Sequence, residues 1–527
     1  MSRSLRFKQV LRALHLARFC NEQRVSTSVG MEMFAHKLSR RRFLLAGAAA
    51  TAACADPGTG RDRAAIQMDP IDVGIVGGGL AGLICADKLR SWGVAATLHE
   101  ANTRLGGRCW SLGNVFPGQV AERGGEFIDN GHKVLIGYAN EFGLAREDHP
   151  KQPGDEAFYF DAQHFPEAAV VDEYRDFVDV MHDDLSELGA PTADSFSPAD
   201  QALDLTNLAE YLDSRGAGPV IRTALDVAYT IEYGLEIAEQ SCLNLLMFIH
   251  ADKRSRFQPF GVFSNERYHV IGGNDGIVQG IAARLTGPIH FGRKLVKVKK
   301  LSDGRIELTF KQGNTTIVAQ HEAVVLALPF STLRDVDLDA SLAIPPWKQL
   351  AIDNFGYGTN AKLMLGFNGR PWLAQGSNGT AYTDLPYLQN SWETNPTNAN
   401  STRAVITDYT GGNLGASLNP NNPQLEAERF LANFDTVYPG AAAQATRLGN
   451  GQLRVHLEHW PSSPFVKGSY TCNPPGYFTT MADNEAKPIG NLYFAGEHTS
   501  SFYEWQGFME GAATSGLRAA DEIRRDF

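Results

Sequence analysis

Two glycine-rich segments near opposite ends of the chain constrain its fold most strongly. The first is residues 71–82, IDVGIVGGGLAG, which Glu100 and the Gly-Gly-Arg tripeptide at 106–108 follow. The second is residues 492–497, LYFAGE, which residues 505–511, WQGFMEG, follow. The first segment alone predicts a dinucleotide site. Both together predict FAD, bound by a domain assembled from the two ends of the chain.

The order of residues in the first segment explains this prediction. Residues 73–76 form a short apolar run typical of a buried strand, and residues 80–92 have the pattern of the helix that follows it. Gly77 permits the tight turn between them, Gly79 lets the backbone approach a pyrophosphate, and Gly82 lets the helix and the strand pack closely.

The start of that helix provides the phosphate site. The N–H groups near Leu80 and Ala81 have no partner within a helix and carry a partial positive charge, so they favour phosphate. Residues 95–99 then predict a second strand, and Glu100 ends it where an acid that binds ribose hydroxyls is expected. This order of strand, helix, strand and acid predicts a nucleotide site more strongly than the glycines alone.

Residues 1–55 have the features of a targeting leader, which lies outside the fold. Residues 39–45, SRRRFLL, resemble a twin-arginine export signal, and a short apolar run follows. The sequence Ala-Cys-Ala at 53–55 fits a cleavage site, and in the alternative interpretation Cys54 is lipidated. We therefore expect the twin-arginine export machinery as a partner and a periplasmic or secreted location. The alternative is a disordered basic tail.

Length and composition set the class of protein. The chain has 527 residues, 43% hydrophobic and 20% charged, which is typical of a globular protein with two domains. No stretch has the roughly eighteen consecutive apolar residues that a membrane span needs. The net charge of −11 disfavours nucleic acid as a partner. We expect no metal site, and we expect the thiols of the cysteines after the leader to be free: Cys85, Cys109, Cys242 and Cys472.

Composition shifts along the chain predict an α/β fold with two domains. We expect a discontinuous Rossmann-type FAD-binding domain in three pieces, at residues 70–150, 265–345 and 453–527. We expect an α+β substrate-binding domain, with a mixed sheet and a helical insertion, at residues 151–264 and 346–452.

Apolar periodicity predicts the individual elements of these domains. Helices are expected at residues 172–188, 205–215, 220–229, 241–249, 272–285 and 509–525. Strands are expected at residues 294–299, 306–310, 323–328, 359–367, 404–407 and 493–495. Loops rich in Asn, Gly and Pro are expected at residues 395–401 and 411–423.

Together these motifs resemble those of the flavin-containing amine oxidases, a family that includes monoamine oxidases, polyamine oxidases and L-amino acid oxidases. The resemblance covers nearly all of residues 70–527 and is strongest at the two ends. It implies a Rossmann-type domain that holds FAD. It also implies a second domain, with a sheet and helices, that covers the reactive face of the flavin.

The resemblance assigns cofactor-binding roles residue by residue. The pyrophosphate loop and the helix start match Gly77, Gly79, Leu80, Ala81 and Gly82, and the ribose acid matches Glu100. The phosphate arginines, the adenine strand and the neighbours of the ribityl chain and flavin match Arg104, Gly107, Arg108, Gly125, Glu126, Phe127, Val296, Trp460, Glu497 and Met509. The helix that begins at Met509 would stabilise the negative charge of reduced flavin by its N-terminal dipole.

The resemblance also implies three catalytic residues. Lys362 matches a lysine that holds a water at flavin N5. Tyr470 and Phe508 match two aromatic residues that flank the substrate nitrogen, because ring faces accept an amine and can align its C–H bond. The alternatives are a solvated lysine and two core aromatic residues.

Three departures from the family pattern refine the expectation. Ser469 replaces the cysteine that tethers flavin in the monoamine oxidases, so we expect non-covalent FAD. Phe127 occupies the position of the arginine that binds the substrate carboxylate in L-amino acid oxidases. Burying a carboxylate without that cation would cost several kcal/mol, which favours an amine. Asp129 falls where some polyamine oxidases place a pocket acid, and it also suits an ordinary turn.

The reaction that the resemblance implies is oxidative deamination of a primary or secondary amine. Hydride equivalents pass from the α-carbon to flavin N5, and water hydrolyses the imine. O2, giving hydrogen peroxide, or a periplasmic electron carrier would reoxidise the flavin. The alternatives are an L-amino acid oxidase that uses Arg222 or Arg267, a C–C desaturase or oxidase of the same superfamily, and a non-catalytic flavin-binding protein. A homodimer also stays open.

Overall fold

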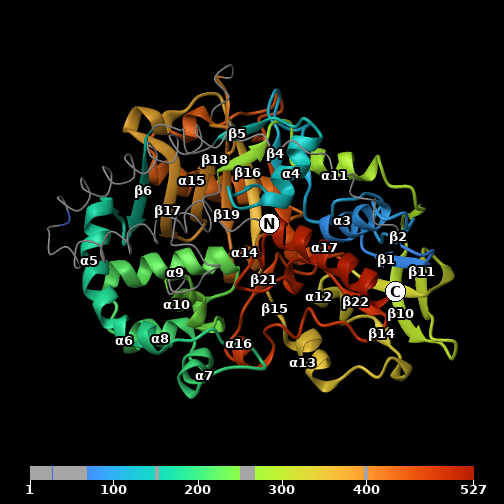
Figure 1. The fold of residues 1–527 in the computed structure, drawn as a ribbon. Coiled ribbons are helices and arrows are strands. Elements are labelled where there is room, and N and C mark those ends of the chain that lie inside the picture. Colours follow the sequence, from blue (N-terminus) through green and yellow to red (C-terminus); the bar gives the residue numbers. More distant parts are fainter. Residues whose placement is uncertain (1–26, 28–67, 149–153, 250–266, 397–401) are drawn as a thin grey trace, which may run out of the picture.

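The computed structural model describes residue 27 and residues 68–148, 154–249, 267–396 and 402–527. The predicted export signal, its cleavage site and Cys54 lie outside the described residues, as does most of the expected loop at 395–401. Figure 1 shows the described chain with a nucleotide-binding sheet on one side, and with a larger sheet and a group of helices on the other.

Both ends of the chain build the nucleotide-binding sheet, as predicted. Its five parallel strands have the order β22-β13-β1-β2-β9. Their bounds are Leu492–Phe494, Ala323–Leu326, Val73–Val76, Thr97–His99 and Ile289–His290. Strand β1 pairs with β13 from Val73↔Ala323 to Val76↔Leu326, and β13 pairs with β22. The first and last strands of the chain therefore lie one strand apart.

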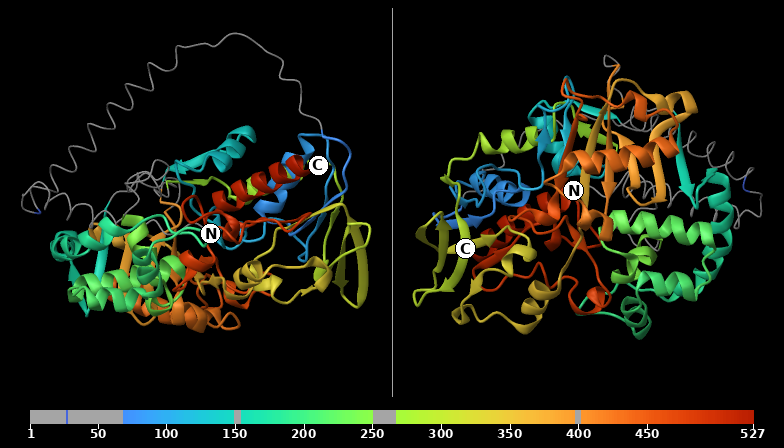
Figure 2. Two further views of the ribbon diagram at one scale, coloured as in Figure 1. Left: turned by 60° about the horizontal axis from the view of Figure 1, so that its bottom comes forward. Right: turned by 180° about the vertical axis from the view of Figure 1, so that it is seen from behind.

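Two helices from opposite ends of the chain cover this sheet. Helix α3, Leu80–Arg90, follows β1, and helix α17, Met509–Asp526, closes the chain. The two helices approach so closely that a Cβ on Gly516 of α17 would lie 2.3 Å from the carbonyl oxygen of Ala81. Figure 2 shows the blue start and the red end of the described chain side by side. Helices α4, Lys133–Glu141, and α11, Asp275–Ala282, complete this part.

Smaller sheets flank the nucleotide-binding part. A four-stranded sheet has the order β12-β11-β10-β14, with bounds Thr315–His321, Ile306–Gln312, Lys294–Lys300 and Asp337–Leu338. Three strand pairs are β3–β4, β5–β8 and β15–β21. Their bounds are Ser111–Leu112, Ala121–Glu122, Arg146–Asp148, Tyr268–Val270, Gly356–Tyr357 and Thr471–Cys472. Helices α12, Phe330–Leu333, α13, Pro346–Asn354, and α16, Tyr477–Thr480, link these sheets.

The second large sheet is mixed, as predicted. Its seven strands have the order β20-β16-β19-β18-β17-β6-β7. Their bounds are Val455–His459, Ala361–Phe367, Ala404–Thr410, Leu388–Glu393, Ser377–Leu385, Asp155–Phe160 and Gln163–Phe165. All described neighbours are antiparallel except β17 and β6, which are parallel. Helix α15, Pro423–Val437, packs Phe430 and Phe434 against residues of β16.

The helical insertion is present, but its boundaries differ from those predicted. The expected helix at 172–188 divides at Met181 into α5, Glu167–Val180, and α6, His182–Glu187. The others are α7, Pro198–Leu205, α8, Leu208–Ser214, α9, Pro219–Tyr233, and α10, Leu243–Ile249. Helix α9 is buried along most of its length and ends at Gly234, which adopts φ +78°. This helix carries the insertion into the main core of the protein.

One predicted loop is wrong in part. Residues Gly412–Ser417, inside the expected loop at 411–423, form helix α14, because Gly411 and Gly412 adopt the extended and positive-φ backbone that starts it. The helix α15 that follows begins at Pro423 and has no counterpart among the predicted elements. Among the described residues, no helix is long and apolar enough to cross a membrane, and no cluster of three metal ligands occurs.

Candidate active site

A deep cavity runs along the carboxyl ends of the nucleotide-binding strands. It encloses about 1240 Å³ of empty space, its open mouth included. The predicted cofactor residues that line it come from both ends of the chain: Gly77, Gly79, Leu80, Ala81, Glu100, Arg104, Gly107, Arg108, Trp460, Glu497 and Met509. The cavity therefore collects the two glycine-rich segments in one place.

The three signature glycines have three different environments. Gly77 adopts φ +109°, and a Cβ there would lie 2.4 Å from the carbonyl oxygen of Ala327. A Cβ on Gly82 would lie 2.0 Å from the carbonyl oxygen of Gly77, so Gly82 allows α3 to pack under the turn. A Cβ on Gly79 would meet no atom within 4 Å. The backbone at Gly79 thus faces open space in the cavity, as a pyrophosphate requires.

The beginning of α3 supplies hydrogen-bond donors to that space. Gly79 caps the helix in an extended conformation without a side-chain hydrogen bond, and the first turn carries no acidic residue. Leu80 and Ala81 line the cavity. Unpaired N–H groups and the positive end of the helix dipole favour a phosphate here.

Glu100 closes one end of the cavity. Its Oε2 accepts a hydrogen bond of 2.7 Å from the Gly78 N–H, and its Oε1 accepts one of 2.6 Å from the Asn102 N–H. Burial raises the pKa of this carboxyl above its ordinary value, although the backbone donors oppose that shift. The donors hold both oxygens in place, and each oxygen keeps a lone pair for a ribose hydroxyl.

Arg108 links the two ends of the chain across the cavity. Its Nη1 donates to Glu497 Oε1 at 2.7 Å and to the Ser469 carbonyl at 2.8 Å. Glu497 Oε2 accepts from Thr471 Oγ1 and from the Gly507 N–H. Burial would raise the pKa of Glu497, but the Arg108 charge prevails and holds it below its ordinary value. Arg108 has further guanidinium donors for the cavity that it lines.

Arg104 is held by stacking. Its guanidinium carbon lies 3.7 Å from the centroid of the Trp110 ring, and the same distance separates Arg123 from that ring. Arg104 Nη2 donates to the Gly107 carbonyl at 2.7 Å. The stacking fixes the arginine at the cavity wall, where its charge favours an anionic ligand.

Other predicted cofactor residues lie behind the cavity wall and do not line it. Val296 lies on β10 beside Lys294 and Leu295, which do line the cavity. A Cβ on Gly125 would lie 2.5 Å from Met509 Sδ, so this glycine allows the segment to pass under α17. The adjacent Glu126 and Phe127 are buried and point into the substrate side of the molecule, as their contacts show.

Lys362 on β16 is buried, so the alternative of a solvated lysine is wrong. Its Nζ donates to Glu126 Oε2 at 2.7 Å, to the Gly124 carbonyl at 2.9 Å and to the Glu122 carbonyl at 3.3 Å. Glu126 Oε1 in turn accepts a hydrogen bond of 2.8 Å from Trp392 Nε1. Neither the ion pair nor Trp392 was expected from the sequence, because the partners come from three separate segments.

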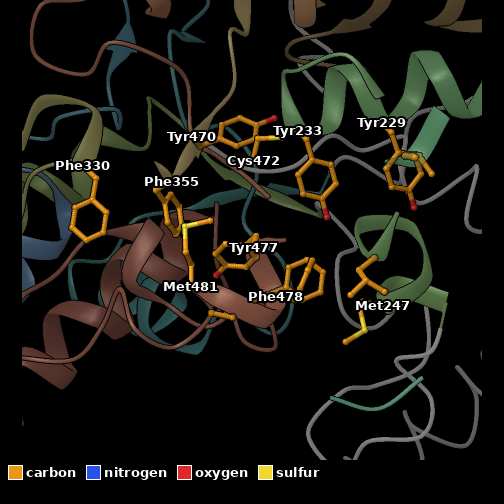
Figure 3. Close-up of a cluster of buried hydrophobic side chains, with 14 of the residues drawn as sticks. Tyr229, Tyr233, Met247, Phe330, Phe355, Tyr470, Cys472, Tyr477, Phe478 and Met481 are labelled. Carbon is orange, nitrogen blue, oxygen red and sulfur yellow. The ribbon is translucent and has the colours of Figure 1, made fainter. Parts of the chain in front are cut away.

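Tyr470 and Phe508 occupy different surroundings. Phe508 precedes α17, lines the cavity, and packs its ring 5.7 Å from Trp505 and 5.5 Å from His132. Tyr470 is fully buried, and its hydroxyl donates to the Glu232 carbonyl on α9 and accepts from the Tyr409 hydroxyl. Figure 3 shows Tyr470 in the buried cluster that Tyr233 of α9 also joins. The hydroxyl thus anchors the ring to the helical insertion.

The four cysteines after the leader form no disulfide, as expected. Cys85, Cys109, Cys242 and Cys472 are free and buried. Ser469 is buried and donates from Oγ to Asn360 Oδ1 at 2.5 Å. Cys109 is the one of these four that lines the cavity, and burial raises its pKa, so it stays a thiol.

Sequence analysis missed part of the cavity wall. Arg293 and Thr332 line it, as do residues 463–466, Ser-Pro-Phe-Val. Arg293 donates from Nη1 to His99 Nδ1 at 3.1 Å, and His99 itself lines the cavity. The position of Arg293 immediately before the predicted strand at 294–299 was the one available signal. No pattern marks residues 463–466.

The cavity can thus hold a dinucleotide by the glycine loop, the helix start, Glu100 and two arginines, with Phe508 and Met509 at one part of its wall. Comparison with known proteins agrees with this arrangement. Residues 80–524 match the family model described as flavin containing amine oxidoreductase. This match covers most of the chain.

Individual relatives are distant but similar along their lengths. An L-amino-acid oxidase from Siganus canaliculatus is 26% identical over 475 residues, which cover 86% of this chain and 85% of the relative. An L-amino acid dehydrogenase from a Synechocystis species is 24% identical over 85% of this chain and 94% of the relative. The structure of cyclohexylamine oxidase from Brevibacterium oxydans superposes with a TM-score of 0.72 at 22% identity, covering 86% of this chain and 99% of that one.

Proposed function

Because this chain belongs to the flavin containing amine oxidoreductase family, we propose that it is a flavoenzyme that oxidises a primary or secondary amine by hydride removal from the α-carbon. The family establishes an oxidoreductase that uses FAD. We infer that the substrate is an amine and not an amino acid. This inference rests above all on the surroundings of Phe127.

The cavity has the donors that FAD needs. The backbone at Gly79, the start of α3 and the arginines Arg104 and Arg108 would hold the pyrophosphate, and Glu100 the ribose. When bound, FAD accepts the hydride equivalent from the substrate and passes the electrons to O2 or to an electron carrier. With Ser469 in place of a tethering cysteine, we propose that FAD binds without a covalent bond.

The residues around Phe127 favour an amine as the substrate. Phe127 is buried, and its ring lies 5.8 Å from that of Trp392. The arginines named above as alternative carboxylate ligands already have partners. Arg222 pairs with Asp213 and Asp226, and Arg267 binds Asp148 through two hydrogen bonds of 2.9 Å. A substrate carboxylate beside Phe127 would therefore lose its hydration without gaining a cation.

The side chains near the cavity also suit the chemistry of an amine. An aromatic, water-poor environment lowers the pKa of an ammonium and so favours the neutral amine, which carries the lone pair that the oxidation needs. Phe508, at the cavity wall, would orient the substrate C–H bond by its ring face. By the resemblance, Tyr470 would contribute a second ring face to the substrate, and its hydroxyl contacts to α9 hold that ring in place.

The test is anaerobic titration of the purified holoprotein. The absorbance of oxidised FAD is followed while primary amines, secondary amines, diamines and L-amino acids are added separately. Bleaching by amines alone supports the proposal. Bleaching by L-amino acids alone contradicts the argument from Phe127, and bleaching by none of them favours C–C oxidation or a non-catalytic role.

A matched pair of variants sharpens this test. Phe508→Ala removes a buried ring from the cavity wall, whereas Phe465→Ala removes a ring that lines the same cavity but is 38% exposed. We expect Phe508→Ala to slow bleaching by amine at least about tenfold. Phe465→Ala should leave the rate nearly unchanged. Equal rates in the two variants would contradict a role for Phe508 in orienting the substrate.

We further propose that the twin-arginine signal at residues 39–45 directs export of the folded holoprotein to the periplasm or beyond. The supporting observation is the sequence SRRRFLL with the apolar run behind it. Replacing both Arg40 and Arg41 with Lys should retain the protein in the cytoplasm. Mass spectrometry of the exported form would distinguish cleavage near Ala53 from lipidation of Cys54.

A further inference from the structure

Three neighbouring strands of the nucleotide-binding sheet end along the cavity. Strands β1, β2 and β9 are parallel and adjacent, and residues that follow their carboxyl ends line the cavity. Gly79 follows β1, Glu100 follows β2 and Arg293 follows β9. A dinucleotide that binds its pyrophosphate at Gly79 and its ribose at Glu100 therefore extends its base toward Arg293.

The backbone fixes Arg293 beside the acid expected at the ribose. The Arg293 N–H donates to the Glu100 carbonyl at 2.9 Å, and the Gly292 N–H donates to the Asn102 carbonyl at 3.0 Å. These two hydrogen bonds join the segment after β9 to the segment after β2. The side chain of Arg293 thus starts directly beside the residue that would bind the ribose.

A chain of hydrogen bonds holds the Arg293 guanidinium, and the chemistry of its members fixes each donor. Arginine only donates, so Arg293 Nη1 donates to His99 Nδ1 at 3.1 Å. Burial lowers the pKa of His99 to about 3, so this ring is neutral and carries its proton on Nε2. That nitrogen donates to His321 Nε2 at 3.3 Å, and His321 Nδ1 donates to Asp72 Oδ1 at 2.9 Å. The chain therefore has one direction, from Arg293 to Asp72.

Packing holds the two imidazoles of this chain. His99 is 1% exposed, and its ring centroid lies 4.5 Å from that of Phe310 at an interplanar angle of 26°. The His321 ring lies against strand β1, where a Cβ on Gly74 would be 2.3 Å from His321 Cδ2. The chain ends at Asp72, whose side chain is 54% exposed. Gly74 therefore leaves room for a link between the cavity wall and the protein surface.

Arg293 keeps its charge for a ligand because its partner is neutral. Within the described residues its guanidinium donates to an imidazole, whereas that of Arg108 donates to the carboxylate of Glu497. A guanidinium has five N–H donors, and His99 takes one of them. The adenine of FAD has ring nitrogens that accept hydrogen bonds. Val296, the residue expected at the adenine, does not line the cavity, whereas Arg293 does.

We propose that Arg293 binds the adenine base of FAD, and that His99, His321 and Asp72 are positioning residues that orient its guanidinium. The proposal rests on the binding of FAD described under the proposed function, and not on the identity of the substrate. It gives the cavity a group that recognises the base, beside those for the ribose and the pyrophosphate.

The first experiment measures FAD affinity with the full-length holoprotein. The protein is diluted, and released FAD is followed by its fluorescence to give the dissociation constant. Arg293→Met removes the charge and the donors, and it should raise this constant at least about tenfold. Lys299→Met is the matched control, because it removes one charge from an exposed position on β10 that does not line the cavity. Screening by water and salt should keep its effect within about twofold.

A second experiment separates the base from the rest of the nucleotide. ADP and ribose 5-diphosphate, which is ADP without its base, are tested as competitors of FAD. The wild type should prefer ADP. Arg293→Met should weaken competition by ADP about tenfold and leave competition by ribose 5-diphosphate unchanged, because only ADP has the base.

Asp72 tests the chain of hydrogen bonds from its exposed end. Asp72→Ala removes the acceptor of His321, so it should lower the preference for ADP over ribose 5-diphosphate about threefold. Asp72→Asn keeps an acceptor oxygen and should restore the preference. A lower free energy of unfolding in Asp72→Ala with an unchanged preference for ADP would mean a structural role alone, and it would overturn the positioning role.

Arg293→Lys keeps the proposal testable if Arg293→Met fails to fold. It keeps the charge, but an ammonium cannot reproduce the planar guanidinium, so the preference for ADP should still fall at least about threefold. Equal losses for ADP and ribose 5-diphosphate overturn the proposal, because Arg293 would then act on the pyrophosphate. Unchanged FAD affinity in Arg293→Met overturns it too, as does a wild type that does not prefer ADP. These measurements use no amine, so a failure of amine oxidation is a separate result.

Discussion

The two sides of the active site use polar groups in opposite ways. On the cofactor side, the Gly79 backbone, the start of α3 and the arginines Arg104 and Arg108 direct donors into a cavity. On the substrate side, Lys362 and Glu126 satisfy each other in the interior. The first arrangement is built for a ligand with many acceptors of its own. In the second arrangement the protein itself supplies the hydrogen-bond partners, so the ion pair does not depend on a ligand.

This difference determines what a substitution should do. Removing a group from the cofactor side should lower FAD occupancy, because the lost donor had a ligand to bind. Removing a group from the substrate side should leave its buried partner without a hydrogen bond or counter-charge. The first effect should therefore be a lower free energy of unfolding. Arg108 combines both kinds of interaction, because it donates to Glu497 and also lines the cavity.

We expect the largest effect from Arg108→Met. The change leaves Glu497, which is 2% exposed, without its cation, and breaking one partner of a buried ion pair costs about 3–5 kcal/mol. Both FAD content and the free energy of unfolding should fall. Arg104→Met is the matched control, because Arg104 stacks on Trp110 and should affect mainly FAD affinity. If the two variants lower the free energy of unfolding equally, the proposed difference between the two sides is wrong.

Gly82→Ala should have the next largest effect. Its Cβ would lie 2.0 Å from the Gly77 carbonyl oxygen, and overpacking of this kind costs about 1–3 kcal/mol. Gly79→Ala meets no protein atom, so it should preserve the melting temperature of the apoprotein and weaken FAD binding about tenfold or more. Calorimetry of the apoproteins and FAD titration separate these outcomes. A destabilised Gly79→Ala apoprotein would show that the open space is not reserved for ligand.

Glu122→Gln tests the buried interior through pH. Burial raises the pKa of Glu122 from its ordinary 4.5 to about 8. Between these two pH values the carboxyl keeps its proton in the folded protein and loses it in the unfolded chain. Stability from this group is present below pH 4.5 and is lost as pH rises toward 8, by up to about 1.4 kcal/mol per pH unit. Melting temperatures from pH 5 to pH 8 should fall less steeply in the variant. Parallel profiles would mean that Glu122 is ionised throughout.

The smallest effect is expected from Tyr470→Phe. It removes the hydroxyl that contacts the Glu232 carbonyl and Tyr409 and keeps the ring, so it should cost about 1 kcal/mol of stability. Anaerobic bleaching by amine should continue within about threefold of the wild-type rate. Tyr470→Leu, which removes the ring, should slow it much more. If the two variants bleach alike, the ring does not orient the substrate.

The sequence predicted the cofactor side well because its geometry is local. The strand at 73–76 was confirmed to the residue, the helix from Leu80 was correct at its start, and the strand at 492–494 was displaced by one residue. In each case the glycines and the apolar run that fix the backbone lie within a few residues of one another. Sites of this kind are visible in a single segment.

The substrate side could not be predicted in the same way. Lys362 and Trp392 lie on strands β16 and β18 of the seven-stranded sheet. Glu126 comes from a segment outside that sheet, so only the tertiary fold brings the three residues together. Strands β17 and β18 were missed, and nothing within residues 388–393 indicates that the Trp392 indole meets a carboxylate. Glu126 was assigned to the cofactor because a resemblance transfers positions and carries no information on a new ion pair.

The pairing of α3 with α17 also has a consequence in time. The nucleotide site is complete only when the last helix has left the ribosome, although its first strand and helix are made at the beginning. At about 5–20 residues per second, the interval between Leu80 and Met509 lasts roughly 20–90 s. For that period the glycine loop has no closing partner. The chain can therefore hold FAD in the complete site only after synthesis of its last helix.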